Sequence, residues 1–181
     1  HLTLFSPDCY NRLGSLAQMN PPIRSLEHQT GLWKGISNGT VDVIGSDHAP
    51  HTIEEKEKKW PNSPSGMPGV QTSLSIMLNH VNNEKLSLQK LIELFSENPC
   101  KIYNIKNKGF IKKGFDADLT VVDLKKEIII ENKDIASKSG WSPFNGMKLK
   151  GSPIATIING SVKMLEGKIF EKPNGKVVNF N

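Results

Sequence analysis

The sequence has few cysteines, few arginines and no long apolar run. Its two cysteines, Cys9 and Cys100, lie far apart, which excludes a disulfide scaffold or a zinc knuckle and favours a reducing cytoplasm. No stretch approaches the roughly 18 apolar residues of a membrane-spanning helix. The formal net charge is +5, yet the basic residues are lysines except for Arg12 and Arg24. Because bidentate phosphate recognition favours arginine, we expect a lysine-rich solvated surface and no nucleic-acid partner.

The composition otherwise suits a packed globular protein. Of the 181 residues, 36% are hydrophobic and 15 are glycine, which is too apolar for a disordered tail. The length fits one ordinary domain or one large piece of a bigger fold. The chain opens at His1 with an apolar, strand-like segment and no recognisable secretory signal. We therefore expect a fragment of a longer protein.

Helical patterns and one buried strand alternate in the first half of the chain. Val41–Gly45 is almost fully apolar, as in a strand buried on both faces of a parallel sheet. Residues 46–69 form a long loop with four prolines and two glycines, and such loops are usually functional. Ser25 and Ser87 are predicted helix N-caps. The expected helices cover residues 7–19 (a short helix or loop), 25–38, 70–81 and 88–95, with a further helical turn from Pro99.

The second half of the chain has strand-like patterns. Asn159-Gly160 between two apolar runs predicts a hairpin with a type I′ turn, and Glu166-Gly167 predicts another turn. The expected strands cover residues 110–111, 118–122, 127–130, 154–158 and 161–165. We therefore place a domain boundary near Gly109, with an α/β region over 1–108 and a small β region over 109–181.

The polar segment Ser46–His51, directly after the predicted strand, carries the strongest functional signal. Catalytic groups of barrel enzymes lie where a rigid strand opens into a loop. A carboxylate such as Asp47 can bind a metal there and accept a proton. The alternative is that Asp47 caps a turn and that His48 and His51 are merely exposed, because Asp-x-x-x-His is a loose pattern.

Two further segments could contact a ligand. Asn20 precedes the rigid Pro21-Pro22 pair, so its amide could bind a planar polar group, although it could equally be a turn asparagine. The loop Ser65–Gly69 could offer main-chain N–H groups, although it could be an ordinary loop-to-helix connection. The charged run Glu54–Lys59 reads as a solvated face.

Four motifs together resemble the C-terminal part of dihydroorotases, which belong to the amidohydrolase superfamily. These motifs are Met19-Asn20-Pro21-Pro22-Ile23-Arg24, Asp42 to His51 with its Ser-Asp-His-Ala-Pro-His ending, Ser65 to Thr72, and Gly140-Trp141-Ser142-Pro143-Phe144-Asn145-Gly146. The resemblance covers nearly the whole chain. It implies an α/β fold, namely the C-terminal part of a metal-dependent (β/α)₈ TIM barrel followed by part of a small β-sandwich, with Val41–Gly45 as strand eight.

The resemblance also implies a reaction and roles for named residues. The family reaction is the reversible cyclisation of N-carbamoyl-L-aspartate to L-dihydroorotate in pyrimidine synthesis. Asp47 matches a metal ligand and general base, His51 a residue that binds the substrate carboxylate, and Asn20, Ser65 and Gly66 other substrate contacts, whereas His48 matches no role. Zinc is the implied cofactor, as one or two ions. Of its usual ligands only Asp47 lies in this chain, so the fragment alone should be inactive.

Two other readings stay open. Another cyclic amidase, such as a hydantoinase or an allantoinase, would share Asp47. However, His51 suits a substrate that bears a carboxylate. A non-catalytic dihydroorotase-like subunit that scaffolds aspartate transcarbamoylase would not need to keep Asp47, Asn20 and His51 together. The expected partners are a small-molecule substrate, the missing N-terminal part of the same protein and, as a candidate assembly, a second copy in a homodimer, with no membrane involved.

Overall fold

The computed structural model describes residues 1–170 and 172–180, which form two compact units. The first unit comprises His1–Val41, Gly45–Ser73 and Ile129–Leu149, and the second comprises Asp42–Ile44, Leu74–Ile128 and Lys150–Asn181. Each unit therefore draws on separated parts of the chain. A domain boundary near Gly109 remains a prediction.

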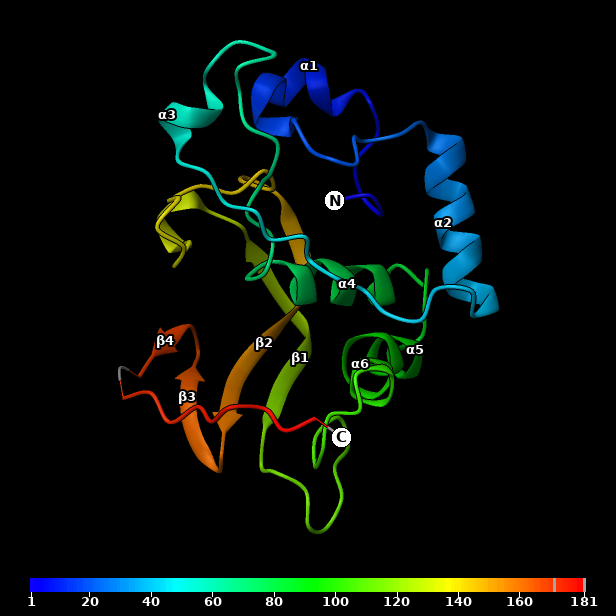
Figure 1. The fold of residues 1–181 in the computed structure, drawn as a ribbon, viewed down its shortest axis with the longest axis vertical. Helices are drawn as coiled ribbons and strands as arrows, with labels where there is room; N and C mark the ends of the chain where they lie inside the picture. The colour runs from blue at the N-terminus through cyan, green and yellow to red at the C-terminus, as the bar shows by residue number, and fades with distance from the viewer. Residues whose placement is uncertain (171, 181) are drawn as a thin grey trace. The chain divides into compact units, whose positions relative to one another are not determined.

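The first unit is built from short helices and loops (Figure 1). Its helical elements are α1 (Cys9–Leu13), the 3₁₀ turn η1 (Gly14–Ala17), α2 (Leu26–Asn38), α3 (Ile53–Lys56) and the 3₁₀ turn η3 (Asn132–Asp134). The predicted end of α2 is confirmed, since Gly39 adopts a left-handed φ of 82° there. The hydrophobic core of the unit contains Phe5, Cys9, Ala17, Met19, Ile23, Ile36, Met67, Ile130, Trp141, Phe144 and Leu149.

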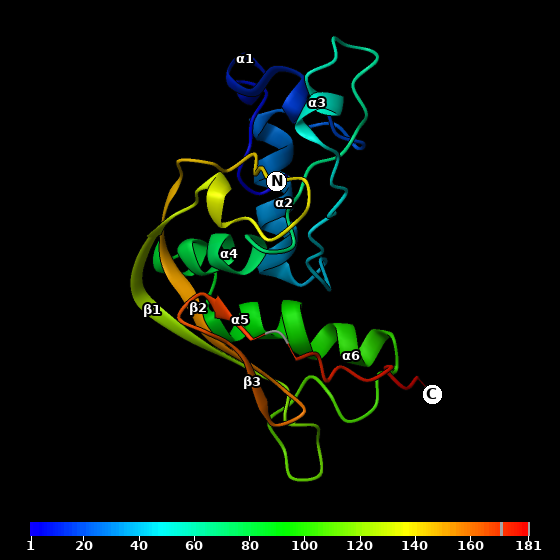
Figure 2. The ribbon, with the colours of Figure 1, turned by 90° about the vertical axis from the view of Figure 1, so that its left-hand side faces the viewer.

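The helices of the second unit are α4 (Ser73–Asn82, belonging to this unit from Leu74), α5 (Leu88–Ile92), the π-helical turn η2 (Glu93–Glu97) and α6 (Asn98–Ile102). Figure 2 shows α5 and α6 following one another along one helical path. The predicted Ser87 cap is confirmed, because its hydroxyl accepts a hydrogen bond of 3.1 Å from the Lys90 N–H. Buried apolar side chains here are Ile76, Met77, Leu78, Leu86, Leu91, Leu94 and Ala155.

A four-stranded sheet has the order β1-β2-β3-β4, and its strands are β1 (Leu119–Ile129), β2 (Lys148–Ile158), β3 (Ser161–Leu165) and β4 (Lys168–Ile169). The predicted hairpin is confirmed: Ile158 pairs with Ser161, and the turn residues Asn159 and Gly160 have φ values of 47° and 74°. Two positive φ values are what a type I′ turn requires. Glu166-Gly167 likewise connects β3 to β4 with positive φ values.

Hydrogen bonds connect helix α4 to strands β1 and β2. The Asn82 amide donates to the carbonyls of Leu124 (3.0 Å) and Lys150 (2.9 Å), and the Lys150 N–H donates to Asn79 Oδ1 at 3.0 Å. Gly151 permits this close approach, because a Cβ on it would lie 2.7 Å from the Leu78 Cβ. The partly buried Asn79 and Asn82 side chains thus bond to main-chain groups of β1 and β2.

Some strand predictions are wrong. Val41–Gly45 is not a buried strand: it is partly exposed and belongs to no ladder among the described residues, and its N–H groups bond to helices, Val41 to the Gly35 carbonyl and Ile44 to the Leu94 carbonyl. A strand needs a neighbouring strand to accept its hydrogen bonds. The runs 118–122 and 127–130 are not separate strands but merge into β1, and 110–111 lies outside any strand.

Candidate functional site

Asp47 is exposed and has a left-handed backbone, with a φ of 49°. Among residues other than glycine, aspartate is one of those that adopt this conformation more often, in turns as well as at functional sites. The Asp47 carboxylate lies near the amino group of His1: burial lowers the pKa of that amino group, and attraction to Asp47 partly opposes this effect. Asp47 is therefore a solvent-accessible carboxylate on a conformationally special backbone.

His48 anchors the loop that follows the candidate site. Its backbone forms a parallel bridge with Met67, and its Nδ1 accepts hydrogen bonds from the N–H groups of Gly69 (3.1 Å) and Val70 (3.4 Å). Because Nδ1 accepts, the proton of the neutral ring resides on Nε2. His48, to which sequence reasoning gave no role, holds the backbone beside Asp47 against residues 67–70.

His51 is half-buried and held at both its backbone and its side chain. The indole Nε1 of the buried Trp141 donates to the His51 carbonyl at 2.8 Å. The His51 Nδ1 lies 3.6 Å from Glu55 Oε2, which forms an ion pair when the imidazole is protonated. The Trp141 motif therefore contributes to the site by fixing His51, a role that the sequence pattern alone did not indicate.

Gly66 packs directly against the segment that contains His51. Its φ is 138°, and a Cβ on it would lie 2.5 Å from the Ala49 carbonyl oxygen and 3.2 Å from His51 Cδ2. Only glycine fits such an approach. The Gly66 N–H donates to the Gln18 carbonyl at 2.9 Å, so this N–H is already used within the protein.

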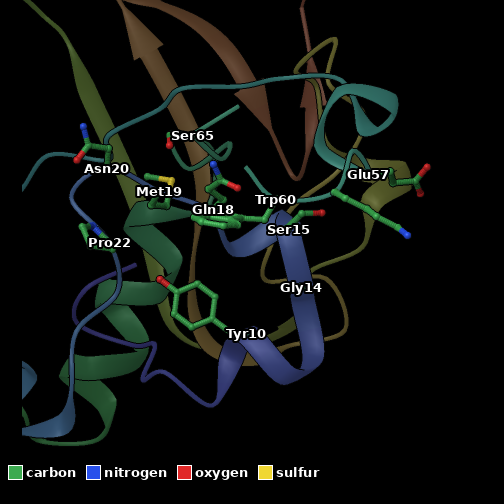
Figure 3. A pocket seen from close by; sticks show the side chains of 11 residues that line it. Tyr10, Gly14, Ser15, Gln18, Met19, Asn20, Pro22, Glu57, Trp60 and Ser65 are labelled. Carbon is green, nitrogen blue, oxygen red and sulfur yellow. The ribbon is translucent and has the colours of Figure 1, made fainter. Parts of the chain in front are cut away.

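Asn20 and Ser65 line one cavity, although they lie far apart in sequence. The cavity has a volume of about 760 Å³, and Figure 3 shows the side chains around it. Its lining residues are Tyr10, Gly14, Ser15, Gln18, Met19, Asn20, Pro22, Glu57, Lys59, Trp60 and Ser65. Asp47 and His51 are not among them. The structure thus places Asn20 and Ser65 on one cavity and Gly66 against His51, whereas Asp47 does not line the cavity.

The predicted solvated face Glu54–Lys59 is exposed except at Lys56, whose exposed fraction is 0%. Its ammonium donates to the carbonyls of Gln18 (3.0 Å) and Pro64 (2.7 Å). Burial lowers the pKa of Lys56 from 10.5 to about 8. Thr52 and Glu55 form the capping box of α3, the short helix whose last residue is Lys56.

The described residues do not by themselves fit a metal ion. Residues 1–170 and 172–180 contain no group of three or more His, Cys, Asp or Glu side chains arranged to hold one. Asp47 offers one carboxylate, whereas a structural or catalytic zinc takes about four ligands. Nor do we find, over the same residues, a helix with the length and apolar character needed to cross a bilayer.

The sequence is similar to curated enzymes over nearly its whole length. The dihydroorotase of Pyrococcus furiosus is 44% identical over 97% of this chain and 40% of that protein. An L-hydantoinase of Paenarthrobacter aurescens is 37% identical over 90% of this chain and 36% of that protein. The chain therefore spans about two fifths of the length of these relatives.

The backbone is similar to that of a solved structure, and the sequence matches a family profile. The L-hydantoinase (dihydropyrimidinase) from Arthrobacter aurescens superposes with a TM-score of 0.90 at 34% identity, over 93% of this chain and 39% of that one. The profile of the amidohydrolase family matches residues 1–163. With most of its length matched in this way, the chain belongs to the amidohydrolase family.

Proposed function

We propose that this chain is the C-terminal part of a dihydroorotase, which interconverts N-carbamoyl-L-aspartate and L-dihydroorotate. The observation that carries this proposal is the 44% identity to a dihydroorotase over 97% of the chain. Other curated dihydroorotases, from Methanosphaera stadtmanae and Pyrococcus abyssi, are 42% and 39% identical. In this proposal the rest of the enzyme comes from polypeptide outside the present chain.

In this function Asp47 is the general base. Its carboxylate is exposed, so it can accept the proton lost by the nucleophile that attacks the ring amide and pass it to the leaving nitrogen. In the biosynthetic direction the same carboxylate moves the proton the other way.

The substrate contacts that we propose are Asn20, Ser65, Gly66 and His51. Two observations support them: Asn20 and Ser65 share a cavity, and Gly66 packs against His51. When protonated, His51 offers a positive donor for a substrate carboxylate. The N–H of Gly66 is already used, so its contact with a ligand would be made by its carbonyl or by the neighbouring Ser65 backbone.

Amidohydrolases and dihydroorotases are generally metal-dependent. We propose zinc as the metal, with Asp47 as one ligand and the remaining ligands outside this chain. The described residues alone do not fit such an ion. We further propose that the first part of the chain completes a (β/α)₈ barrel, that the strands belong to a small β-sandwich, and that the protein is cytoplasmic, in agreement with its two free cysteines.

A hydantoinase is the second candidate, because a solved L-hydantoinase superposes with a TM-score of 0.90. The two candidates differ in the substrate group that His51 would meet. Dihydroorotate bears a carboxylate, whereas unsubstituted hydantoin does not. A histidine donor suits an anionic substrate group, and this favours dihydroorotate.

The test is turnover by the full-length protein that carries this chain. We expect hydrolysis of L-dihydroorotate, and its formation from N-carbamoyl-L-aspartate, with kcat/KM well above that for hydantoin or allantoin. Faster turnover of hydantoin would favour the second candidate. A folded protein that turns over none of these substrates would instead support a non-catalytic subunit, with binding to aspartate transcarbamoylase as the follow-up measurement.

A further inference from the structure

Lys56 connects three segments of the first unit through its side chain and its backbone. Its ammonium donates to the Gln18 and Pro64 carbonyls, at 3.0 and 2.7 Å. Its own carbonyl accepts hydrogen bonds from the hydroxyls of Ser15 (2.5 Å) and Ser63 (3.1 Å). One residue therefore holds residues 15–18 and 63–66 together.

The two segments also bond to each other around Lys56. The Gln18 side chain donates to the Ser63 carbonyl at 2.7 Å, and the Gln18 carbonyl accepts the Gly66 N–H at 2.9 Å in addition to the Lys56 ammonium. The side-chain bonds of the cluster are partly or fully buried, and burial makes a hydrogen bond stronger than at the surface. The cluster thus has few alternatives to its present geometry.

The carbonyls that Lys56 binds lie next to the proposed substrate contacts. Pro64 directly precedes Ser65, and Gln18 lies two residues before Asn20. Asn20 and Ser65 line the same cavity, and Gln18 lines it too. A shift of either segment would therefore change the distance between the groups that face a ligand.

A lysine is an unfavourable residue to bury if its only role is a structural contact. Its charge loses hydration on burial, and among the described residues no carboxylate lies within ion-pair distance of its ammonium to compensate. An apolar side chain of the same length would fill the space without this cost. The specific gain from lysine is that one group with several donors binds two carbonyls from different segments.

We propose that Lys56 is a positioning residue that sets the distance between the Asn20 segment and the Ser65–Gly66 segment for substrate binding. This inference rests on the proposed function, because it takes Asn20 and Ser65 as substrate contacts. Lys56 itself does not touch the substrate. It acts through the Gln18 and Pro64 carbonyls.

The first test is steady-state kinetics of the full-length enzyme with Lys56→Met, a substitution that keeps the length of the side chain and removes its donors. Displaced binding groups should raise KM for dihydroorotate about 10-fold or more, with a smaller change in kcat. The matched control is Lys58→Met, since Lys58 is an exposed lysine two residues further along the same loop. An unchanged KM in folded Lys56→Met enzyme would overturn the proposal.

A double-mutant cycle separates positioning from general destabilisation. If Lys56 acts through Asn20, the variant with both Lys56→Met and Asn20→Ala should bind substrate as tightly as the single variant with the lower affinity. Fully additive losses would contradict the proposal. Should Lys56→Met fail to fold, Ser63→Ala removes one contact to the Lys56 carbonyl. It should then raise KM about threefold, and an unchanged KM would count against the inference.

Hydrogen exchange at the Gly66 N–H gives a readout that needs no substrate. Lys56→Met should speed exchange of this amide at least about 10-fold while amides of α4 keep their protection. Unchanged Gly66 exchange would refute the positioning role whatever the enzyme catalyses. Faster exchange in a protein whose wild type does not turn over dihydroorotate would instead support the role of Lys56 and reject the proposed function.

Discussion

At the scale of single residues, the general-base role that we propose for Asp47 can be tested most directly. We expect Asp47→Asn in the full-length enzyme to lower kcat by about 10²- to 10⁴-fold, the usual contribution of a general base, and to leave the fold intact. Asp42→Asn, an exposed carboxylate in the same segment, is the control. The measurement is dihydroorotate turnover beside a circular dichroism spectrum. Near-wild-type turnover by folded Asp47→Asn enzyme would exclude the role.

Asn20 and His51 should act on binding rather than on the chemical step. Removing a hydrogen bond to a charged substrate costs roughly 1 to 3 kcal/mol, so Asn20→Ala and His51→Ala should each weaken dihydroorotate binding by that amount. The metal content should stay that of the wild type. Calorimetric titration together with metal analysis checks this. A variant that loses metal but keeps its affinity for dihydroorotate would show that the substituted residue is a metal ligand and not a substrate contact.

The pKa of Lys56 predicts how stability depends on pH. Burial lowers this pKa to about 8 in the folded state, against 10.5 for the free side chain, and the hydrogen-bonding residues around it, Ser15, Gln18, Ser63 and Pro64, carry no titrating groups. Between these two values the unfolded state binds more protons, so the free energy of unfolding rises with pH in this window.

We therefore expect the stability of the wild type to improve relative to Lys56→Met as the pH is raised from about 8 to about 10. Denaturation midpoints of both proteins at each pH provide the measurement. Because every other titrating group is common to both, the comparison isolates Lys56. A difference that stays constant over this range would show that the lysine pKa is not lowered by folding.

At the scale of elements, the attachment of α4 to β2 depends on Gly151. Its φ is 102°, and a Cβ there would meet the Leu78 Cβ at 2.7 Å, so Gly151→Ala adds a clash to an unfavourable backbone. We expect a loss of about 2 to 4 kcal/mol in the free energy of unfolding, combining overpacking and left-handed strain.

Gly167→Ala is the matched control for this substitution. Gly167 also has a positive φ, 80°, but nothing lies within 4 Å of the added Cβ, so only the backbone term of about 1 kcal/mol should appear. Denaturant unfolding of both variants separates the two costs. Equal losses would mean that packing against α4 contributes little.

The elements that could be predicted from sequence are those fixed by local chemistry. The turn at Asn159-Gly160 and the cap at Ser87 depend on neighbouring residues only, and both formed as expected. Val41–Gly45 could not be predicted in the same way, because an apolar run becomes a strand only when another strand accepts its hydrogen bonds.

Burial of a charged side chain was equally hidden from the sequence. Lys56 lies among charges of both signs, which usually indicates solvent exposure, and its carbonyl partners lie 8 and 38 residues away. The candidate site residues were predicted from specific motifs, and their roles stay predictions. Their arrangement was not predicted, since only the folded chain shows Asn20 and Ser65 on one cavity and His51 against Gly66.

At the scale of the whole molecule, metal content should distinguish the chain from the enzyme that we propose. We expect the 181-residue chain alone to hold well below one zinc per molecule, because the proposed ligand Asp47 is one of the roughly four that zinc needs. The longer polypeptide should hold one or two. Elemental analysis after desalting measures the zinc content of both proteins. A stoichiometric zinc on the short chain, with dihydroorotase turnover, would refute the division of ligands.

The burial of Lys56 also bears on chemical labelling. A reagent that acylates amines needs an accessible, neutral nitrogen, and in the folded protein no part of this side chain can be reached. The reagent should attack Lys56 only in molecules whose two flanking segments have momentarily separated. The rate at which Lys56 is modified, relative to that of the exposed Lys58 two positions along, would therefore report how often this loop opens.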